Sequence, residues 1–410
     1  MKRIFANLGW LLGGRGVNAV LSLVYLGLAT RSLGIEDFGR FTLIVVMAQM
    51  LAGLLSFSTW QGVVRWGAEL GRAGEATGFA VALDLASLCA GLPVVAAAAW
   101  LAPLWLPLEP DLRGAALGMG ACALLALRST PVGVLRLYDR YGLAASAEAA
   151  LPLVRALGAG MAALFWPTIT GFVVAWALAE LACAAAHWLL ALRVQPLRRA
   201  DISLSALPAR HGDAWRFVWS TNLSRSLAVT SRQAVQLLVG AIGGAAIAAG
   251  YRLAAQLGTA LVQLGEAVSR AIYPELVRAG DEAGALAGRM AAIAATAGLL
   301  ATGIAVLFGR EALVWLAGAD FAMAATALTI LVAGGACELL AASWDARLVA
   351  QGRAATVLVL RGVPLVFAMA SLPLVIPALG LSGAAASMAL ASAVTAGLLV
   401  YVAGWRAAMR

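Results

Sequence analysis

The sequence predicts an all-α integral membrane protein with about twelve transmembrane helices, arranged as two six-helix lobes related by a pseudo-twofold axis along the membrane normal. Three observations predict this fold class. Of the 410 residues, 62% are hydrophobic and 12% are charged, whereas a soluble domain has about 25% charged residues. Apolar segments of about 20 residues, long enough to span a bilayer, recur along the chain. The longest polar connection, residues 193–213, divides these segments into two equal sets.

Twelve segments have the length and the apolar character of a spanning helix. The first follows Lys2 and Arg3 but continues past Ala29 without a cleavage-site pattern, so we interpret it as a retained span rather than a signal peptide. The expected domains are an N-terminal lobe over 1–192, a cytoplasmic linker over 193–215 and a C-terminal lobe over 216–410. The twelve segments are residues 8–30, 41–64, 79–102, 113–135, 147–166, 169–192, 216–239, 247–269, 287–308, 321–343, 355–376 and 381–403.

The distribution of basic residues predicts the orientation. If the N-terminus is cytoplasmic, eighteen lysine and arginine residues fall in the inside connections or at the termini, and four fall outside, at Arg31, Arg40, Arg113 and Arg310. Basic residues concentrate on the cytoplasmic side of membrane proteins, so both termini are expected inside. The net charge of +9 is then mainly a topology signal, and no nucleic-acid partner is expected.

Two arginines lie deep within the seventh segment. Arg225 and Arg232 are seven residues apart, so they share one helix face with Asn222 and Gln236. An arginine at the centre of a bilayer costs about 2.5 to 3.5 kcal/mol even on the mildest insertion scale. Both side chains must therefore face protein or water. Either they form a buried ion pair that holds helices together, or they line a cationic cavity, and we favour the cavity.

Polar stripes also follow the eighth and first segments. Residues at steps of three or four in the eighth segment form one polar helix face, which predicts a water-filled path because lipid would leave these groups without partners. These residues are Arg252, Gln256, Thr259, Gln263, Glu266 and Arg270. A shorter stripe in the first segment contains Arg15, Asn18, Ser22 and Tyr25.

Isolated ionisable residues occur inside other spans. For Arg155, Glu180 and Glu338 we favour pairing between helices. Asp84 and Glu266 are candidates for coupling to a proton or sodium gradient, although Glu266 has a fixed pair with Arg270 as an alternative. The full set is Asp84, Arg128, Arg155, Glu180, Glu266, Glu338 and Arg361.

The spans contain more arginine than acid, and this surplus predicts an anionic guest. Each unpaired guanidinium needs compensating charge, and its planar fork fits phosphate oxygens. The residues expected to bind such a guest are Arg15, Asn18, Asn222, Arg225, Arg232, Gln236, Gln256, Gln263 and Arg361.

The sequence lacks the motifs that several classes of enzyme require. Lys2 is the single lysine, so a GxxxxGK phosphate loop is excluded. His187 and His211 stand apart without an HExxH spacing, which excludes a zinc hydrolase of that kind and predicts no metal site. The cysteines, Cys89, Cys122, Cys183 and Cys337, are interpreted as small buried apolar residues. The sequence is typical of a carrier and not of an enzyme.

The two halves of the sequence show a weak internal repeat. Arg15 precedes Gly34 by nineteen residues, and Arg225 precedes Gly243 by eighteen. Six spans in each half give both halves the same orientation in the membrane, as expected for repeats related by an axis along the membrane normal.

The opening NLGWLLGGRGVNAVLSLVYLGLATRSLGIEDFGRFTLI, residues 7–44, resembles that of the polysaccharide (O-antigen type) flippases, a family of the multidrug/oligosaccharidyl-lipid/polysaccharide exporter superfamily. The twelve-span layout extends the resemblance over the chain, whereas the second half matches mainly by layout and by Arg225, Gly243 and Gly250. The matching features of the opening are Asn7, Arg15, ATRSLG (29–34), EDFGRF (36–41) and Arg65.

The resemblance implies a flippase of the bacterial inner membrane. Such a protein moves an undecaprenyl-pyrophosphate-linked oligosaccharide from the cytoplasmic to the periplasmic leaflet by alternating access, for lipopolysaccharide O-antigen or exopolysaccharide assembly. A polysaccharide polymerase and glycosyltransferases are the expected partners. One alternative is a multidrug cation antiporter on the same fold, which is expected to have a net acidic cavity. Another is a membrane enzyme of glycan assembly, which is expected to have a sizeable outside loop.

Overall fold

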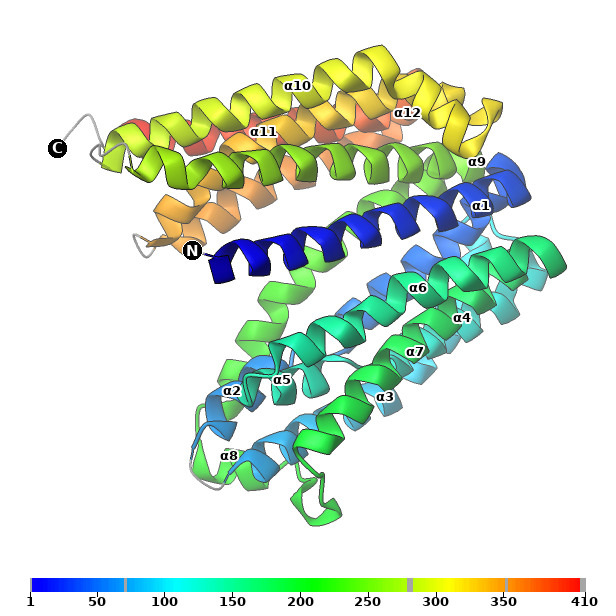
Figure 1. Ribbon diagram of the computed structural model, residues 1–410. Helices are drawn as coiled ribbons and strands as arrows, with labels where there is room; N and C mark the ends of the chain where they lie inside the picture. Colours follow the sequence, from blue (N-terminus) through cyan, green and yellow to red (C-terminus); the bar gives the residue numbers. More distant parts are fainter. Residues whose placement is uncertain (1, 70–71, 279–282, 351–352, 406–410) are drawn as a thin grey trace. The chain divides into compact units, whose positions relative to one another are not determined.

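The computed structural model describes residues 2–69, 72–278, 283–350 and 353–405. Within these ranges, side chains are described except those of residues 2–19, 224–225, 227–229, 264–278, 283–291, 343, 346–347, 349–350, 354 and 403–405. All regular secondary structure in the described ranges is helical (Figure 1). The all-α class predicted from the sequence is confirmed.

Twelve α-helices and four short 3-10 helices follow one another along the chain. The α-helices are α1 (Lys2–Leu55), α2 (Trp60–Gly67), α3 (Ala73–Leu101), α4 (Arg113–Leu125), α5 (Ser129–Leu137), α6 (Tyr141–Phe165), α7 (Ile169–Val194), α8 (Ala206–Arg210), α9 (Ala214–Arg278), α10 (Ala283–Ala317), α11 (Ala325–Ala350) and α12 (Ala354–Trp405). The 3-10 helices are η1 (Ala102–Leu104), η2 (Pro110–Leu112), η3 (Arg199–Asp201) and η4 (Ala319–Ala324).

Three of the long helices turn sharply at a glycine. Gly34 in α1, Gly244 in α9 and Gly380 in α12 have φ angles of 73°, 85° and 58° with ψ angles far from helical values. Side chains strongly disfavour this backbone region, so glycine allows the direct turn from one span into the next. Nine helices in the described residues are long and apolar enough to span a membrane. Dividing α1, α9 and α12 at these glycines gives the twelve expected spans.

The turn in α9 corrects the repeat alignment expected from the sequence. Gly244, and not Gly243, has the positive φ angle, and its backbone angles of 85° and 177° nearly equal the 73° and −179° of Gly34. Arg225 precedes Gly244 by nineteen residues, the same spacing that separates Arg15 from Gly34. The two halves therefore match in register here, because backbone geometry identifies the equivalent glycine.

Two segments expected to span without interruption are broken in the structure. The helix after Gly34 ends at Leu55, and α2 starts at Trp60 after a non-helical stretch over residues 56–59. The expected span 113–135 divides into α4 and α5, with residues 126–128 between them. Non-helical backbone at membrane depth requires partners from the protein or from water, and both breaks are therefore candidate functional positions.

The chain forms two compact units, residues 1–237 and 238–410. The first part of α9 belongs to the first unit because its Ala214 and Val218 pack with Trp66, Phe79 and Leu207 in one apolar cluster. The sequence had placed the division in the polar linker over 193–215. The polar linker separates the two sets of six spans in the sequence. The boundary between the compact units lies later because the start of α9 packs on α2 and α3.

Small residues allow close packing between the long helices of the second unit. In this unit, α10 lies along α11, and α11 lies along α12 (Figure 1). A Cβ atom added at Gly298 would lie 2.4 Å from the Cβ of Ala336, and one at Gly334 would lie 2.9 Å from the Cα of Ala389. Helices in membranes associate largely through such close contacts between small residues.

Candidate functional site

The two helix breaks of the first unit meet through hydroxyl groups. The Oγ1 atoms of Thr59 and Thr130 lie 2.8 Å apart, and the backbone N–H of Trp60 donates to Ser129 Oγ at 3.1 Å. Thr59 and Thr130 are both almost fully buried. Ser and Thr favour such positions because their hydroxyls accept hydrogen bonds from free backbone N–H groups at helix starts. Hydrogen bonds thus connect the two breaks directly to each other within this unit.

Side chains from two other helices satisfy further backbone groups at the breaks. The N–H of Ser58 donates to Asn222 Oδ1 of α9 at 3.2 Å, and the carbonyl of Leu127 accepts from Trp188 Nε1 of α7 at 2.9 Å. Asn222 is buried at 7% exposure. The sequence assigned Asn222 to a cationic stripe. In the structure its amide oxygen accepts from the backbone of the first break, and its role in substrate binding stays a prediction.

Asp84 of α3 lies beside this hydroxyl cluster. The Thr130 hydroxyl donates to Asp84 Oδ2 at 2.5 Å, and Asp84 is 2% exposed. Its Oδ1 atom, like Ser87 Oγ one turn further along α3, is buried without a hydrogen-bond partner among the described residues. A buried carboxyl with an unsatisfied oxygen is costly. The structure therefore places one of the two expected coupling residues in a polar, enclosed position.

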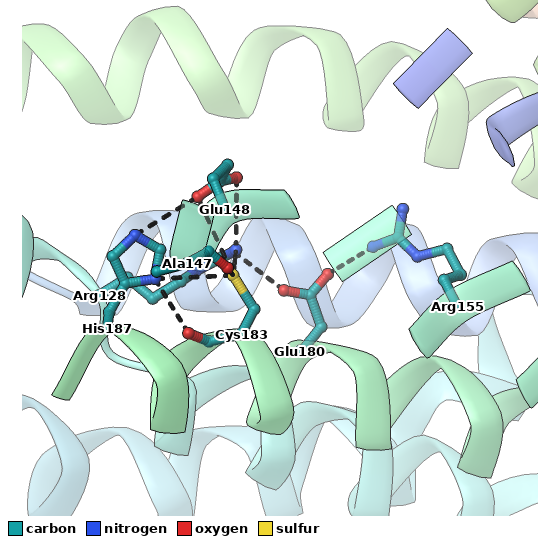
Figure 2. A network of polar contacts seen from close by, with 7 residues as sticks. All are labelled: Arg128, Ala147, Glu148, Arg155, Glu180, Cys183 and His187. Carbon is teal, nitrogen blue, oxygen red and sulfur yellow. Dashed lines mark hydrogen bonds and ion pairs between the residues drawn. The ribbon is translucent and has the colours of Figure 1, made fainter. Parts of the chain in front are cut away.

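A second polar network starts at the same break (Figure 2). Arg128, which immediately precedes α5, donates from Nη2 to Glu180 Oε2 of α7 at 2.9 Å, and Arg155 of α6 donates to Glu180 Oε1 at 2.8 Å. The Arg155 and Glu180 side chains are 14% and 10% exposed. One carboxylate thus forms ion pairs with two guanidinium groups, and it links α7 to α6 and to the start of α5. The expected interhelical pairing of Arg155 and Glu180 is confirmed.

Aromatic rings enclose the Arg155 end of the network. The guanidinium carbon lies 3.7 Å from the centroid of the Trp176 ring and 5.4 Å from that of Tyr25. The two rings pack edge to face with centroids 5.1 Å apart. A cation over an aromatic face is attracted by the negative π surface. Tyr25 therefore connects the first span of α1 to the ion network.

The other end of the network contains a cysteine and a histidine. Arg128 Nη1 lies 3.3 Å from Cys183 Sγ and 3.7 Å from Glu148 Oε1, and Glu148 Oε2 lies 3.7 Å from His187 Nε2. Cys183 and His187 are buried, whereas the Glu148 side chain is 60% exposed. Sequence reasoning missed this cluster. The available signal was the spacing of four residues between Cys183 and His187, which places both on one face of α7.

The second unit has an ion network of the opposite composition. Arg361 of α12 donates from Nη1 to Glu338 Oε2 of α11 at 2.8 Å and from Nε to Asp345 Oδ2 at 2.7 Å. Here one guanidinium serves two carboxylates. The expected pairing of Glu338 is confirmed. Arg361 was expected to bind an anionic guest, and its two carboxylate partners now provide compensating charge. That role remains a prediction.

The remaining predicted site residues occupy different environments. Arg232 is exposed and Gln236 is buried, although the sequence placed both on one face of the seventh span. In the second unit, Gln256 is half-buried and Gln263 is exposed. The side chains of four further residues, Arg15, Asn18, Arg225 and Glu266, lie outside those that the structure describes.

The expectation that the cysteines are small buried apolar residues is corrected. Cys183 is buried, but it contacts charged groups and is not a purely apolar packing residue. Cys89 is exposed, and Cys122 and Cys337 are half-buried. Helical spans in a membrane protein have apolar surfaces on all sides, so sequence hydropathy does not distinguish an outward position from an inward one.

Comparisons with known proteins agree on the fold. No protein-family profile matches the chain. An inner membrane protein of Escherichia coli (strain K12), YghQ, is 29% identical over 327 residues, which cover 76% of this chain and 90% of the relative. An inward-facing multidrug resistance MATE family transporter of the MOP superfamily aligns with a TM-score of 0.69 and 15% identity over 95% of this chain and 94% of its own. The lipid II flippase MurJ, in an inward closed conformation, aligns with a TM-score of 0.73 and 8% identity over 95% of this chain and 86% of its own.

The chain has the fold of MOP-superfamily transporters. At these identities the solved structures establish the fold alone. Together with the spanning helices, they identify a multi-pass membrane protein built like known transporters and a known flippase. The expected twelve-helix class with two lobes is confirmed.

Proposed function

We propose that this protein flips an undecaprenyl-pyrophosphate-linked oligosaccharide from the cytoplasmic to the periplasmic leaflet of a bacterial inner membrane, for cell-surface polysaccharide assembly. The fold shared with a lipid II flippase supports movement of a lipid-linked substrate. The similarity to an Escherichia coli inner membrane protein supports the location. The fold likeness to transporters also supports a carrier over an enzyme of glycan assembly.

The main structural support is Arg232. It lies twelve residues before the Gly244 turn, about 18 Å along the helix at 1.5 Å per residue, which is well inside a hydrocarbon core of about 30 Å. Its side chain is exposed, and no ion-pair partner occurs among the described residues. A guanidinium at this depth needs water or an anion. Most other described span arginines at such depths, including Arg128, Arg155 and Arg361, already have carboxylate partners.

A lipid pyrophosphate meets the requirements of an unpaired arginine. Its oxygens accept two parallel hydrogen bonds from the planar guanidinium fork, and the charge of arginine is fixed at physiological pH. The sugars of the substrate need neutral donors and acceptors, and we propose Gln256 and Gln263 for this role from their residue type and their place on the polar face of the eighth span. Arg225 is proposed to act with Arg232 because the two share one helix face.

The proposal is tested by export of surface glycan from cells. Arg225→Ala and Arg232→Ala are expected to abolish surface glycan while membrane levels of the protein stay near normal. Arg232→Lys is expected to restore export only in part, because an ammonium group does not form the bidentate fork. Arg31→Ala, which changes an arginine near the Gly34 turn, is the matched control and should export normally. Normal export by the double Arg225→Ala, Arg232→Ala variant would refute the assignment.

The rival function is a multidrug cation antiporter on the same fold. Asp84 favours it, because this buried carboxyl has no basic partner among the described residues and an acid of this kind attracts cations. We assign Asp84 instead to coupling with a proton or sodium gradient. In proteoliposomes, Asp84→Asn should lose stimulation by an imposed gradient and still bind the lipid-linked glycan. Gradient-driven export of cationic dyes with no glycan transport would favour the antiporter.

A further inference from the structure

We propose that Glu148, Cys183 and His187 form a binding site for a thiophilic divalent cation of the zinc type. The three residues come from α6 and α7 and lie at the Arg128 end of the ion network (Figure 2). One ligand atom from each lies within 4.8 Å of the other two. This inference does not depend on what the protein transports.

The distances approach those of a tetrahedral zinc site. Cys183 Sγ lies 3.9 Å from Glu148 Oε2, and His187 Nε2 lies 3.7 Å from the same oxygen. With bonds of about 2.0 to 2.3 Å, tetrahedral ligands stand roughly 3.3 to 3.6 Å apart. Contraction by a few tenths of an ångström brings both contacts of Glu148 Oε2 into this range. The remaining pair, the thiol and the imidazole, lies within the 4.8 Å that bounds the whole group, and a bound ion would draw these two side chains together as well. Sulfur, nitrogen and oxygen together are a typical ligand set for zinc, with a fourth position left for water.

A backbone hydrogen bond already orients the histidine. His187 Nδ1 lies 2.9 Å from the carbonyl oxygen of Cys183, so the tautomer that fits this contact donates from Nδ1. The lone pair is then on Nε2, which faces Glu148. Histidines that bind metals generally donate their other ring nitrogen in this way, and the contact fixes both ring orientation and tautomer. The four-residue spacing of Cys183 and His187 places both on one helix face.

The site has a fixed interior and an accessible rim. Cys183 and His187 are 0% and 1% exposed, whereas the Glu148 side chain is 60% exposed. An ion can therefore enter past Glu148, bind the two buried ligands, and release the thiol proton to solvent as the thiolate forms. Arg128 Nη1 currently contacts both Cys183 Sγ and Glu148. The ion and this guanidinium compete for the same atoms, and a bound ion leaves Arg128 with Glu180.

The test uses Co²⁺ as a spectroscopic probe of purified protein in detergent. A chain in which Cys89, Cys122 and Cys337 are replaced by serine retains only Cys183. This chain should bind one Co²⁺ per protein, with a thiolate-to-cobalt charge-transfer band and tetrahedral d–d bands, and excess Zn²⁺ should remove both. His187→Gln in this background should weaken binding by about 100-fold or more, and Cys183→Ser should abolish the charge-transfer band. Arg128→Gln removes the competitor and should tighten binding.

His211→Gln is the matched control, because His211 is the other histidine of the chain and belongs to a different contact with Glu69. Its Co²⁺ affinity should equal that of the parent. A charge-transfer band that survives Cys183→Ser, or unchanged affinity in His187→Gln, would overturn the site. Protection of Cys183 from alkylation by Zn²⁺ in the single-cysteine chain needs no substitution at the site. Absence of protection would overturn it even if the ligand variants fail to fold.

Discussion

The equivalent helices of the two units differ in continuity. The fourth span of the first unit is interrupted at residues 126–128, whereas the fourth helix of the second half, α11, runs unbroken from Ala325 to Ala350. Likewise, residues 56–59 interrupt the second span, whereas α9 continues from the Gly244 turn to Arg278. The same fold thus forms with either a continuous or an interrupted helix at these positions. The broken version occurs where hydroxyl and amide side chains replace the lost backbone hydrogen bonds.

The ion networks of the two units differ in sign and burial. The Glu180 side chain, which is 10% exposed, forms ion pairs with two arginines. The Arg361 side chain, which is 37% exposed, forms ion pairs with two acids. In each network, the shared residue joins neighbouring helices. Because a charge that loses its partner is more costly in a drier environment, the two units should respond unequally to the loss of their shared residue.

The largest effect is expected from Glu180→Gln. This change leaves Arg128 and Arg155 without their common carboxylate and should reduce stability by about 3–5 kcal/mol, the range for breaking a buried pair. Arg361→Gln should reduce it by only about 1–3 kcal/mol, because the Arg361 and Glu338 side chains are 37% and 39% exposed, and an exposed ion pair stabilises a protein less than a buried one. Thermal unfolding in detergent measures both. Glu148→Gln, at a 60% exposed side chain, is the control with an expected loss below about 1 kcal/mol. Equal losses for Glu180→Gln and Arg361→Gln would contradict the difference in burial.

A smaller effect is expected where the two breaks join. Thr130→Val removes the hydroxyl that binds both Asp84 and Thr59, and should destabilise the protein by about 1.5–3 kcal/mol by leaving a buried acid without its donor. Thr130→Ser keeps the hydroxyl and should recover most of this loss. Chemical denaturation monitored by tryptophan fluorescence provides the comparison. If the valine and serine variants unfold alike, the hydroxyl does not stabilise the break.

The smallest effect should be shared by the two units. Gly34→Ala and Gly244→Ala place a Cβ at φ angles of 73° and 85°, which should destabilise each variant by about 1–2 kcal/mol. The two losses should agree because the backbone angles agree. Gly118→Ala is the control, since this α4 glycine has no neighbour within 4 Å and an ordinary helical φ. Its melting temperature should stay constant or rise. A clear inequality between Gly34→Ala and Gly244→Ala would show that the two turns are not equivalent.

The sequence predicted the spanning helices well because the thickness of the bilayer requires about 20 apolar residues per helix, and a hydropathy pattern shows segments of that length directly. It missed the breaks, since serine and threonine reduce the mean hydropathy of a window only slightly. The Ser-Thr dipeptide was a partial signal, because it occurs at 58–59 and 129–130, directly at the two breaks, but also at 220–221 inside the continuous helix α9. These residues favour helix starts. The second dipeptide is followed by Pro131, which is tolerated in a first helical turn.

The candidate sites were harder to predict than the spans. The cost of isolated charge predicted that Arg155 and Glu180 each pair between helices, but it did not identify their partners, which depend on how α6 lies along α7. The same holds for Glu148, which is thirty-five residues from Cys183 and meets it only through that packing. Helical periodicity gives the face of each residue and not the axial offset between two helices. For this reason Arg361 was assigned to a guest, whereas its carboxylate partners on α11 went unrecognised.

The matched turns at Gly34 and Gly244 bear on the history of the gene. These glycines are separated by 210 residues, as are Arg15 and Arg225. A half with an even number of spans begins and ends on the same side of the membrane. A tandem duplication of such a half therefore inserts its second copy in the original orientation, with the flanking basic residues already suited to it. An ancestor of six spans would need no inversion and no redistribution of charge to become this chain.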